Sequence, residues 1–315
     1  MSKFLVTGGA GFIGGHISEL LVSEGHEVVV FDNFSTGSLG NLAAVAGQVK
    51  IIEGDIRDID ALNYVMRGVE HVCHQAAEIS NTKSVEDPAY VNSVNVDGTL
   101  NVLISARDAG VKRLAMASSC AIYGDTGTQA QREDFLPHPL SPYGATKLCG
   151  EHYLSVFHQI YGLETVALRY FNVFGPRQNP ASQYAAVIPK FIDRIMRGHK
   201  LHIYGDGKHT RDFVYVENVA RANYLACTAP KAAGGLFNIA SGQSIDLNEL
   251  VRQLRVLAGR EVEVVYDPPA VGDIKYSASD ISKARELLGY EPLVSFEEGL
   301  KRAFAYFAAK SGTAR

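Results

Sequence analysis

The sequence predicts an α/β fold in which a doubly wound parallel sheet carries a smaller, interleaved C-terminal lobe. Short apolar runs alternate with helical patterns through the first half of the chain. These runs mostly lack alternation of apolar and polar residues, which is typical of strands buried on both faces. The first run leads through a glycine turn, Thr7–Gly14, into a helical pattern. Strand, glycine turn and helix in this order predict a Rossmann-like sheet.

The expected strands are joined by helical stretches, so the crossovers between them should be right-handed. Their carboxyl ends should meet at one edge of the sheet, where ligands bind in open α/β folds. In chain order the strands are Lys3–Thr7, Glu27–Phe31, Val49–Glu53, His71–His74, Arg113–Ala117 and Thr165–Arg169.

The character of the sequence changes after Gly175, where prolines interrupt the chain and shorter, mixed elements follow. A later apolar run, Leu236–Ile239, indicates that the chain returns to the sheet. We therefore expect two interleaved units and a short frayed tail. Their ranges are 1–174 for the Rossmann-like domain with 236–240 returning to it, 175–310 for the smaller lobe and 311–315 for the tail.

Length and composition are those of a soluble, cytoplasmic enzyme with a large core. The chain has 315 residues and a formal net charge of −4, so neither nucleic acid nor an anionic membrane is an expected partner. No segment is long and apolar enough to span a bilayer. His71 and His74 would face opposite sides of a strand, and the cysteines are scattered, so we expect no metal site and no disulfide framework. The cysteines are Cys73, Cys120, Cys149 and Cys227.

The glycine turn has the residues that a dinucleotide site needs. Gly8 permits a tight turn, Gly11 lets a pyrophosphate approach the backbone, and Gly14 lets the helix pack close to the strand. N–H groups at the helix N-terminus can then hold the phosphates. The second apolar run is followed by Asp32, whose carboxylate can bind both ribose hydroxyls of NAD and would repel the 2′-phosphate of NADP. We therefore expect NAD as the cofactor.

Ser119, Tyr143 and Lys147 are the candidate catalytic residues. Tyr143 and Lys147 are four residues apart, which places them one turn apart on one helix face. Free tyrosine has a pKa of ~10, and a nearby ammonium favours the phenolate and should lower that pKa. Ser119 follows an expected strand, where its hydroxyl can hydrogen-bond the same substrate oxygen as Tyr143. A tyrosine and a lysine at this spacing alone are more often a surface pair, but the glycine turn, Asp32 and Ser119 favour catalysis.

With these residues in view, the chain resembles the extended short-chain dehydrogenase/reductases. Within them it is similar to the NAD-dependent nucleotide-sugar 4-epimerases, in particular the group acting on UDP-N-acetylglucosamine or UDP-glucose. The resemblance runs over nearly the whole chain, in order. Its segments are Thr7–Gly14, Asp32-Asn33, Gly54-Asp55-Ile56, His74-Gln75-Ala76-Ala77, Asn95–Thr99, Ser118-Ser119, Ser141–Lys147, Arg169–Gly175, Ala185–Lys190, Tyr204–Phe213 and Gly272–Ser277.

The resemblance implies a role for each matching residue. Tyr143 would be the base, Lys147 would bind the nicotinamide ribose and tune Tyr143, and Ser119 would orient the sugar hydroxyl. The implied NAD contacts are Gly8, Gly11, Phe12, Ile13, Gly14, Asp32, Asn33, Asp55, Ile56, Ala76, Ala77, Asn95, Tyr143, Lys147 and Phe171. The implied UDP-sugar contacts are Ser84, Ser119, Tyr143, Asn172, Val187, Tyr204, Arg211 and Ser277. The resemblance also makes a homodimer through helices near 96–109 and 143–161 as plausible as simple core packing.

Two positions depart from the family pattern. Much of the family has an arginine two residues before the Gly-Asp that matches Gly272-Asp273, and Ala270 stands there instead. Either Arg211 holds the diphosphate alone, another cation substitutes, or nucleotide affinity is weaker. Glu78 replaces the small or apolar residue that is commoner at its position. It would disfavour a uronic acid if it pointed inward, but it can equally point to solvent.

The expected reaction is reversible C4 epimerisation of a UDP-sugar through a transient 4-keto sugar, with NAD retained. UDP-GlcNAc/UDP-GalNAc is the favoured pair, and UDP-Glc/UDP-Gal is also possible. The alternatives are a UDP-glucuronate 4-epimerase, a decarboxylase, a 4,6-dehydratase, or a silent NAD-sensing protein. Dehydratases of this family carry an Asp-Glu pair after the serine or threonine, where this chain has Cys120-Ala121. Silent relatives commonly lose the catalytic Tyr or Lys, which this chain keeps.

Overall fold

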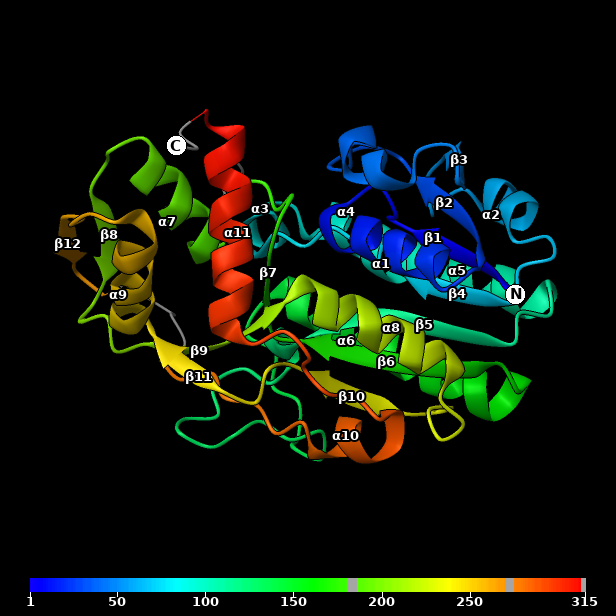
Figure 1. The fold of residues 1–315 in the computed structure, drawn as a ribbon. Helices are drawn as coiled ribbons and strands as arrows, with labels where there is room; N and C mark the ends of the chain where they lie inside the picture. Colours follow the sequence, from blue (N-terminus) through cyan, green and yellow to red (C-terminus); the bar gives the residue numbers. More distant parts are fainter. Residues whose placement is uncertain (181–185, 270–274, 313–315) are drawn as a thin grey trace.

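The computed structural model describes residues 1–180, 186–269 and 275–312. Its centre is a seven-stranded parallel sheet in the order β10-β6-β5-β4-β1-β2-β3 (Figure 1). The doubly wound parallel sheet expected from the sequence is confirmed, and every predicted strand is present. The strands are β1 (Lys3–Thr7), β2 (Glu27–Asp32), β3 (Val49–Glu53), β4 (His71–His74), β5 (Arg113–Ser119), β6 (Glu164–Tyr170) and β10 (Leu236–Ile239).

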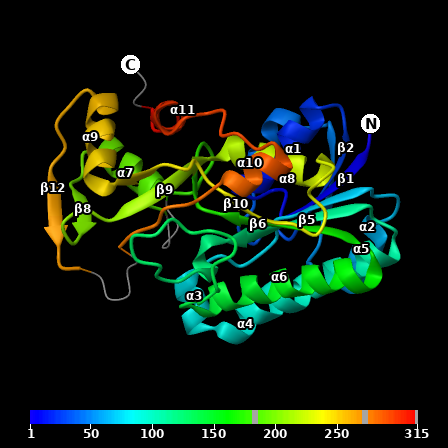
Figure 2. The same cartoon turned by 90° about the horizontal axis from the view of Figure 1, so that it is seen from below.

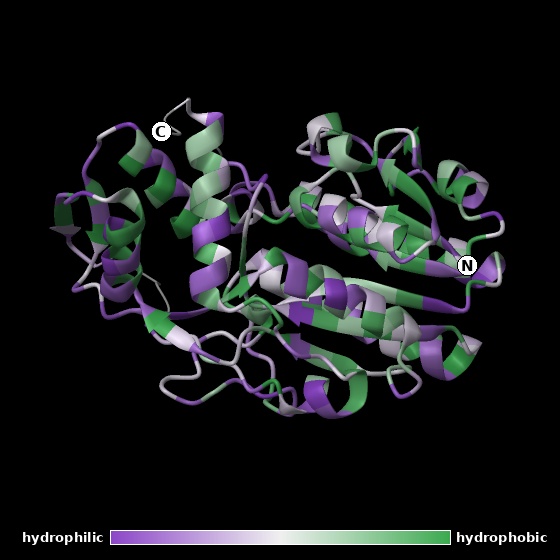
Figure 3. Ribbon diagram, in the orientation of Figure 1, coloured by the Kyte–Doolittle hydropathy of each residue, from purple (hydrophilic) through white to green (hydrophobic). Residues whose placement is uncertain are grey.

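Helices cover both faces of this sheet, as the view from below shows (Figure 2). The sheet shares one hydrophobic cluster with α1 (Phe12–Ser23), α8 (Val216–Thr228) and α10 (Ser282–Leu288). It shares a second with α2 (Ile59–Val65), α5 (Gly98–Asp108) and α6 (Pro142–Tyr161). Neighbouring residues of β1 enter different clusters, Val6 the first and Leu5 the second. This burial on both faces explains the continuous apolar runs of the strands, which are mostly green in Figure 3.

A third hydrophobic cluster holds the smaller lobe together. Its centre is aromatic, with ring centroids of Phe174, Phe213 and Phe296 5.5 to 6.3 Å apart. Three helices of the lobe contribute to it: α7 (Val187–Met196), α9 (Leu247–Ala258) and α11 (Phe296–Lys310). The strands of the lobe form a three-stranded sheet of β7 (Asn172–Phe174), β9 (Thr210–Tyr215) and β11 (Ser244–Asp246), and a two-stranded sheet of β8 (Leu201–Tyr204) and β12 (Val264–Asp267).

The two units interleave more deeply than the range 175–310 implies. Strand β10 pairs with β6 at the edge of the large sheet. Helices α8 and α10, which lie inside that range, pack on the large sheet, and α8 also contacts β7 and β9 of the smaller lobe. An apolar helix pattern shows that a face is buried but not which sheet buries it, so the sequence could not assign these two helices.

Several short elements connect the main ones. Helix α4 runs through a π-helical turn into α5, so the helix expected from residue 96 is the end of a longer, bent segment. The short elements are η1 (Leu39–Val45), α3 (Asn81–Glu86), α4 (Pro88–Asn92), η2 (Ser93–Asp97) and η3 (Cys120–Ile122). Among the described residues, no helix has the length and apolar character to cross a membrane. The end of the expected tail, 313–315, lies outside the described residues.

A buried ion pair fastens α6 to the sheet. Arg169 of β6 donates to the Glu151 carboxylate of α6 through Nε at 2.9 Å and Nη2 at 2.7 Å. The Ser118 hydroxyl of β5 donates to the same carboxylate. The two charged side chains are only 3% and 8% exposed. Removing one partner would leave the other charge buried without compensation.

Glu151→Ala is therefore expected to lower the free energy of unfolding by about 3–5 kcal/mol. The matched control is Glu249→Ala, because Glu249 accepts two hydrogen bonds from Arg252 on the exposed surface of α9. Breaking that pair should cost no more than about 1 kcal/mol. Urea unfolding of both variants measures the difference. Equal losses would show that burial of the Arg169 pair does not matter.

Candidate active site

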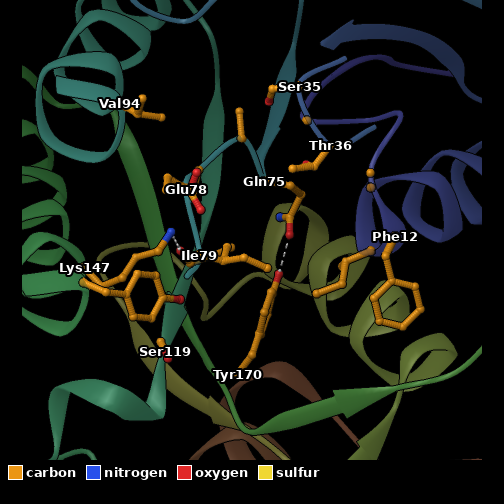
Figure 4. Close-up of a pocket in the computed structure, with 18 of the residues that line it drawn as sticks. Phe12, Ser35, Thr36, Gln75, Glu78, Ile79, Val94, Ser119, Lys147 and Tyr170 are labelled. Atoms are coloured by element: carbon orange, nitrogen blue, oxygen red, sulfur yellow. Dashed lines mark hydrogen bonds between the residues drawn. The ribbon is translucent and has the colours of Figure 1, made fainter. Parts of the chain in front are cut away.

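A cavity of about 470 Å³ lies at the carboxyl edge of the central sheet. Residues at or after the ends of β1 to β6 line it, so it spans most of the sheet (Figure 4). The strand order places Asp32 and Asp55, after β2 and β3, toward one end. It places Ser119 and Phe171, after β5 and β6, toward the other. The cavity thus lies at the carboxyl edge of the sheet, where the fold predicts that a ligand binds.

The glycine turn has the geometry that its sequence predicts. Gly8 has a φ of +67°, and a Cβ there would lie 2.6 Å from the amide nitrogen of Ala76. A Cβ on Gly14 would lie 2.2 Å from the Gly8 carbonyl oxygen, so only glycine lets α1 pack this close to β1. Helix α1 begins after Gly11, and its first turn lines the cavity. Its N–H groups and the positive end of its dipole therefore face the ligand space.

Two acidic residues, Asp32 and Asp55, line the cavity at the ends of β2 and β3. Asp32 is buried and accepts N–H groups from Ala10 at 2.9 Å and Phe34 at 2.8 Å. Burial raises the pKa of the Asp32 carboxyl. Asn33 donates to Asp55 at 3.0 Å, and the hydrogen-bonded Arg57 guanidinium holds the pKa of Asp55 well below its usual range. The cavity therefore has hydrogen-bond acceptors where an adenosine ribose would lie in this fold.

The three candidate catalytic residues meet at the β5 end of the cavity. Ser119 ends β5, and Tyr143 and Lys147 lie one turn apart on α6. The Ser119 hydroxyl accepts the N–H of Ala121 at 3.1 Å and lies close enough to the Tyr143 phenol to lower its pKa. The Lys147 ammonium donates to the Ala117 carbonyl at 2.9 Å and lies 6.0 Å from the centre of the Tyr143 ring. The structure thus brings the predicted constellation together.

Burial opposes the lowering of the Tyr143 pKa that the sequence predicts. Burial raises the pKa of Tyr143 to about 12, and the hydrogen bond with Ser119 opposes this only in part. Burial also lowers the pKa of Lys147 to about 8. Both shifts have one cause, because a low-dielectric site disfavours the charged form of either group. The spacing of the two residues predicted their proximity but not the loss of solvent around them.

A ring of hydrogen bonds beneath the cavity was not predicted. Tyr170 donates to Gln75 at 3.1 Å, Gln75 donates to Asn223 at 2.9 Å, and Asn223 donates back to the Tyr170 oxygen at 2.7 Å. Figure 4 shows Gln75 and Tyr170 joined across the cavity floor. The ring ties the ends of β4 and β6 to α8. Gln75 and Asn223 are 148 residues apart, so no local pattern could reveal the contact.

Most of the predicted cofactor residues line the cavity. Asn172, predicted as a substrate contact, lines it too. The predicted residues in the wall are Gly8, Gly11, Phe12, Ile13, Gly14, Asp32, Asn33, Asp55, Ile56, Ala76, Ala77, Ser119, Tyr143, Lys147, Phe171 and Asn172.

Two predicted contact residues lie behind the wall instead. Asn95 is buried in the π-helical turn η2, where its amide bonds the N–H and C=O of Glu78 at 2.8 and 2.9 Å. Ser84 is fully buried in α3 and donates to the Asn81 carbonyl. Asn95 was expected in a loop-to-helix turn at the cofactor, but the continuous helix places it one layer away. Both residues shape the wall rather than face the cavity.

The predicted contacts in the smaller lobe lie beyond the part of the cavity that the described residues line. Val187 begins α7 and packs on the third cluster, and Tyr204 ends β8 with about half of its surface exposed. Arg211 lies on β9 and donates to its neighbour's carbonyl at 2.9 Å. Ser277 is 7% exposed, and its N–H donates to Thr210 at 3.1 Å. The positions Ala270 and Gly272-Asp273 fall outside the described residues.

Neither Cys120 nor His74 is poised for other chemistry. Burial raises the pKa of the Cys120 thiol to about 12, which disfavours a nucleophilic thiolate. The two ring nitrogens of His74 hydrogen-bond the hydroxyls of Thr7 at 2.7 Å and Thr99 at 3.0 Å. The imidazole therefore joins β1, β4 and α5 in the core.

The wall of the cavity fits a dinucleotide. The turn of Gly8 and Gly14 leaves space that a Cβ would fill. Gln178 donates to the Val173 carbonyl at 3.1 Å, and its buried Oε1 has no hydrogen-bond partner in the described structure. Gln178 is one of the residues that line the cavity. An acceptor left unpaired in a buried wall is costly unless a ligand donor satisfies it.

Comparison with known proteins agrees with this geometry. A model of the "NAD dependent epimerase/dehydratase family" matches residues 4–240. The UDP-glucose 4-epimerase of Thermotoga maritima, solved with UDP-glucose, is 41% identical with a TM-score of 0.93, covering 98% of this chain and 99% of that one. The UDP-N-acetylglucosamine 4-epimerase of Methanobrevibacter ruminantium, solved with UDP-N-acetylmuramic acid, is 38% identical with a TM-score of 0.94 and the same coverage. The UDP-glucose 4-epimerase of Mycolicibacterium smegmatis is 36% identical over 98% of this chain and 99% of its own.

Asp32→Ala is expected to reduce the ratio of NAD to NADP affinity by at least about tenfold, or about 1.4 kcal/mol. The lost carboxylate would no longer repel a 2′-phosphate. The matched control is Asp58→Ala, because Asp58 also accepts two backbone N–H groups but lies outside the cavity wall. Calorimetric titration with both dinucleotides measures the ratio. Equal affinity of the unmutated protein for NADP and NAD would contradict the role of Asp32.

Proposed function

The chain belongs to the NAD-dependent epimerase/dehydratase family, and we propose that it inverts carbon 4 of a UDP-linked hexose. The favoured pair is UDP-GlcNAc and UDP-GalNAc, and UDP-Glc and UDP-Gal form a second pair. The observation that carries the proposal is the meeting of Ser119, Tyr143 and Lys147 at one end of a cavity whose other wall is a glycine turn. The similar 4-epimerases support the same reaction.

The side chains of the site have distinct tasks in this reaction. NAD, when bound by the glycine turn and Asp32, would supply the hydride chemistry at carbon 4. Tyr143 takes the proton of the 4-hydroxyl as general base and later returns it. Ser119 hydrogen-bonds the same hydroxyl and holds it against Tyr143. No net oxidation occurs, so the cofactor should stay bound through turnover.

Lys147 provides the charge that Tyr143 needs. The lysine pKa of about 8 still leaves most of the ammonium protonated at pH 7. In a site with little solvent, a positive charge one helical turn away stabilises a phenolate more than it would in water. In the proposed mechanism this positive charge opposes the desolvation that raises the pKa of Tyr143.

The residues after Ser119 argue against a 4,6-dehydratase. Such an enzyme needs an acid and a base at these positions to eliminate water from carbons 5 and 6. Desolvation raises the pKa of the Cys120 thiol, and Ala121 has no ionisable group. A silent NAD-sensing protein would have no need of all three catalytic residues.

A substrate panel tests the proposal directly. UDP-Glc, UDP-Gal, UDP-GlcNAc, UDP-GalNAc and UDP-GlcA are incubated separately with the protein and followed by proton NMR. We expect C4 epimers without accumulation of NADH. A 4-keto-6-deoxy product would indicate a dehydratase, loss of carbon dioxide a decarboxylase, and no product a sensor.

We also propose that the protein acts as a homodimer through α5 and α6. The outer side of α6 exposes several apolar side chains, with Val156 43%, Ile160 70% and Tyr161 50% exposed. Helices α5 and α6 lie together on one outer face of the molecule (Figure 2). An apolar stripe of this kind on a long helix is suited to pairing with a second copy.

Tyr143→Phe is expected to reduce turnover by roughly 10²–10⁴-fold at saturating UDP-sugar, because the proton acceptor is lost while the ring still packs. NAD content, measured by absorbance after denaturation, should stay normal. Near-normal turnover in this variant would rule out Tyr143 as the base.

Ser277→Tyr is expected to lower activity on UDP-GlcNAc sharply and on UDP-Glc less. By resemblance, Ser277 borders the substituent at carbon 2 of the sugar. Ser277 is buried and its carbonyl accepts the Ser244 hydroxyl at 2.9 Å, so a tyrosine cannot simply turn to solvent. Steady-state kinetics with both substrates, alongside thermal unfolding, measure the effect. Equal losses on the two substrates, or none, would remove Ser277 from the specificity pocket.

A further inference from the structure

Glu78 is a cavity residue whose side chain the proposed reaction does not use. It follows Ala76-Ala77 after β4 and lines the cavity. In Figure 4, Glu78 and Ile79 lie between the side chains of Lys147 and Gln75. The sequence left open whether this carboxylate points inward or to solvent. In the structure it is only 14% exposed, so it belongs to the wall.

The backbone of Glu78 is fixed relative to the catalytic helix. The side-chain amide of Asn95 accepts the Glu78 N–H at 2.8 Å and donates to the Glu78 carbonyl at 2.9 Å. The same amide donates to the Thr146 hydroxyl at 3.0 Å. Thr146 lies between Tyr143 and Lys147 on α6. The position of Glu78 is therefore set by the helix that carries the proposed base.

The carboxylate of Glu78 is also held at its end. Oε1 accepts the Ser80 N–H at 3.1 Å, and Oε2 accepts the Lys83 ammonium at 2.9 Å. Lys83 is 39% exposed, does not line the cavity, and lies 4.1 Å from the centre of the Tyr90 ring. Of these two residues only Glu78 lines the cavity, and the ion pair with Lys83 lies at its wall.

The described wall of the cavity carries little positive charge that would favour an anionic sugar. Among the described residues that line the cavity, Lys147 is the only cationic side chain. Its ammonium donates to the Ala117 carbonyl. The carboxylate of a hexuronate close to Glu78 would be repelled by it. Little solvent reaches this wall, so the repulsion would be poorly screened.

We propose, on the basis of the proposed function, that Glu78 is a specificity-determining residue that admits neutral hexoses and rejects hexuronates. The rejection is electrostatic, between the Glu78 carboxylate and the C6 carboxylate of the sugar. The Ser80 N–H and the Lys83 ammonium hold the carboxylate in place, and Asn95 holds the backbone of Glu78. The substrate class of the site is therefore a UDP-linked hexose with an uncharged carbon 6.

Glu78→Gln tests this inference, because it removes the charge and keeps the shape. We expect the ratio of kcat/KM for UDP-GlcA to that for UDP-Glc to rise at least about tenfold, or about 1.4 kcal/mol. The matched control is Glu86→Gln, which removes the same charge from an exposed position on α3. The control should leave the ratio unchanged. An unchanged or lower ratio in Glu78→Gln, or equal use of both substrates by the unmutated protein, would overturn the inference.

A double variant separates repulsion from attraction. In Glu78→Gln the Lys83 ammonium loses its partner and could itself attract a uronate. Glu78→Gln with Lys83→Met removes both charges, and we expect it to keep the raised ratio. Return of the ratio to its original value would assign the effect to Lys83 and contradict the role of Glu78.

A binding measurement keeps this test independent of turnover. In the Tyr143→Phe background, calorimetry with NAD present gives the Kd of UDP-Glc and of UDP-GlcA. Glu78→Gln should shift the ratio of these constants in favour of UDP-GlcA. If no sugar is epimerised by the unmutated protein, the proposed function fails, while the Kd ratio still decides whether Glu78 selects against a uronate.

Discussion

The active site depends on the buried ion pair between Arg169 and Glu151. Glu151 lies one turn beyond Lys147 on α6, and its carboxylate also accepts the Ser118 hydroxyl, next to Ser119 on β5. One carboxylate therefore sets the helix of the proposed base against the strand of the proposed orienting hydroxyl. A hydrophobic contact could slide by a fraction of an ångström, whereas a two-point hydrogen-bonded ion pair fixes both distance and angle.

The same desolvation that makes this pair strong also governs the chemistry. It raises the pKa of Tyr143 and lowers the pKa of Lys147, so the ground state of the site favours an uncharged tyrosine. A phenolate becomes accessible only when positive charge lies close to it. A dry site makes that charge effective, because few solvent dipoles screen it. Burial thus disfavours the Tyr143 phenolate when no positive charge is near. It also strengthens the attraction between a positive charge and the phenolate during the reaction.

Features set by local sequence could be predicted, and features set by distant partners could not. The strands were readable because burial on both faces leaves continuous apolar runs, and the turn was readable because Gly14 has no space for a Cβ. The spacing of Tyr143 and Lys147 placed them on one helix face. The ring of Gln75 with Asn223 needs two segments 148 residues apart. The pKa of Tyr143 depends on burial in the folded molecule, which no local pattern reveals.

Asn95 connects the wall of the cavity to the catalytic helix. It was expected at the cofactor, yet its amide lies behind the wall and bonds Glu78 on one side and Thr146 on the other. All of its hydrogen bonds join a cavity-facing segment to the catalytic helix. The wall that meets the sugar and the helix that carries Tyr143 are therefore parts of one rigid unit. A change in the charge of Glu78 can then alter which sugar is accepted without displacing the base, because the clamp acts on the backbone and not on the carboxylate.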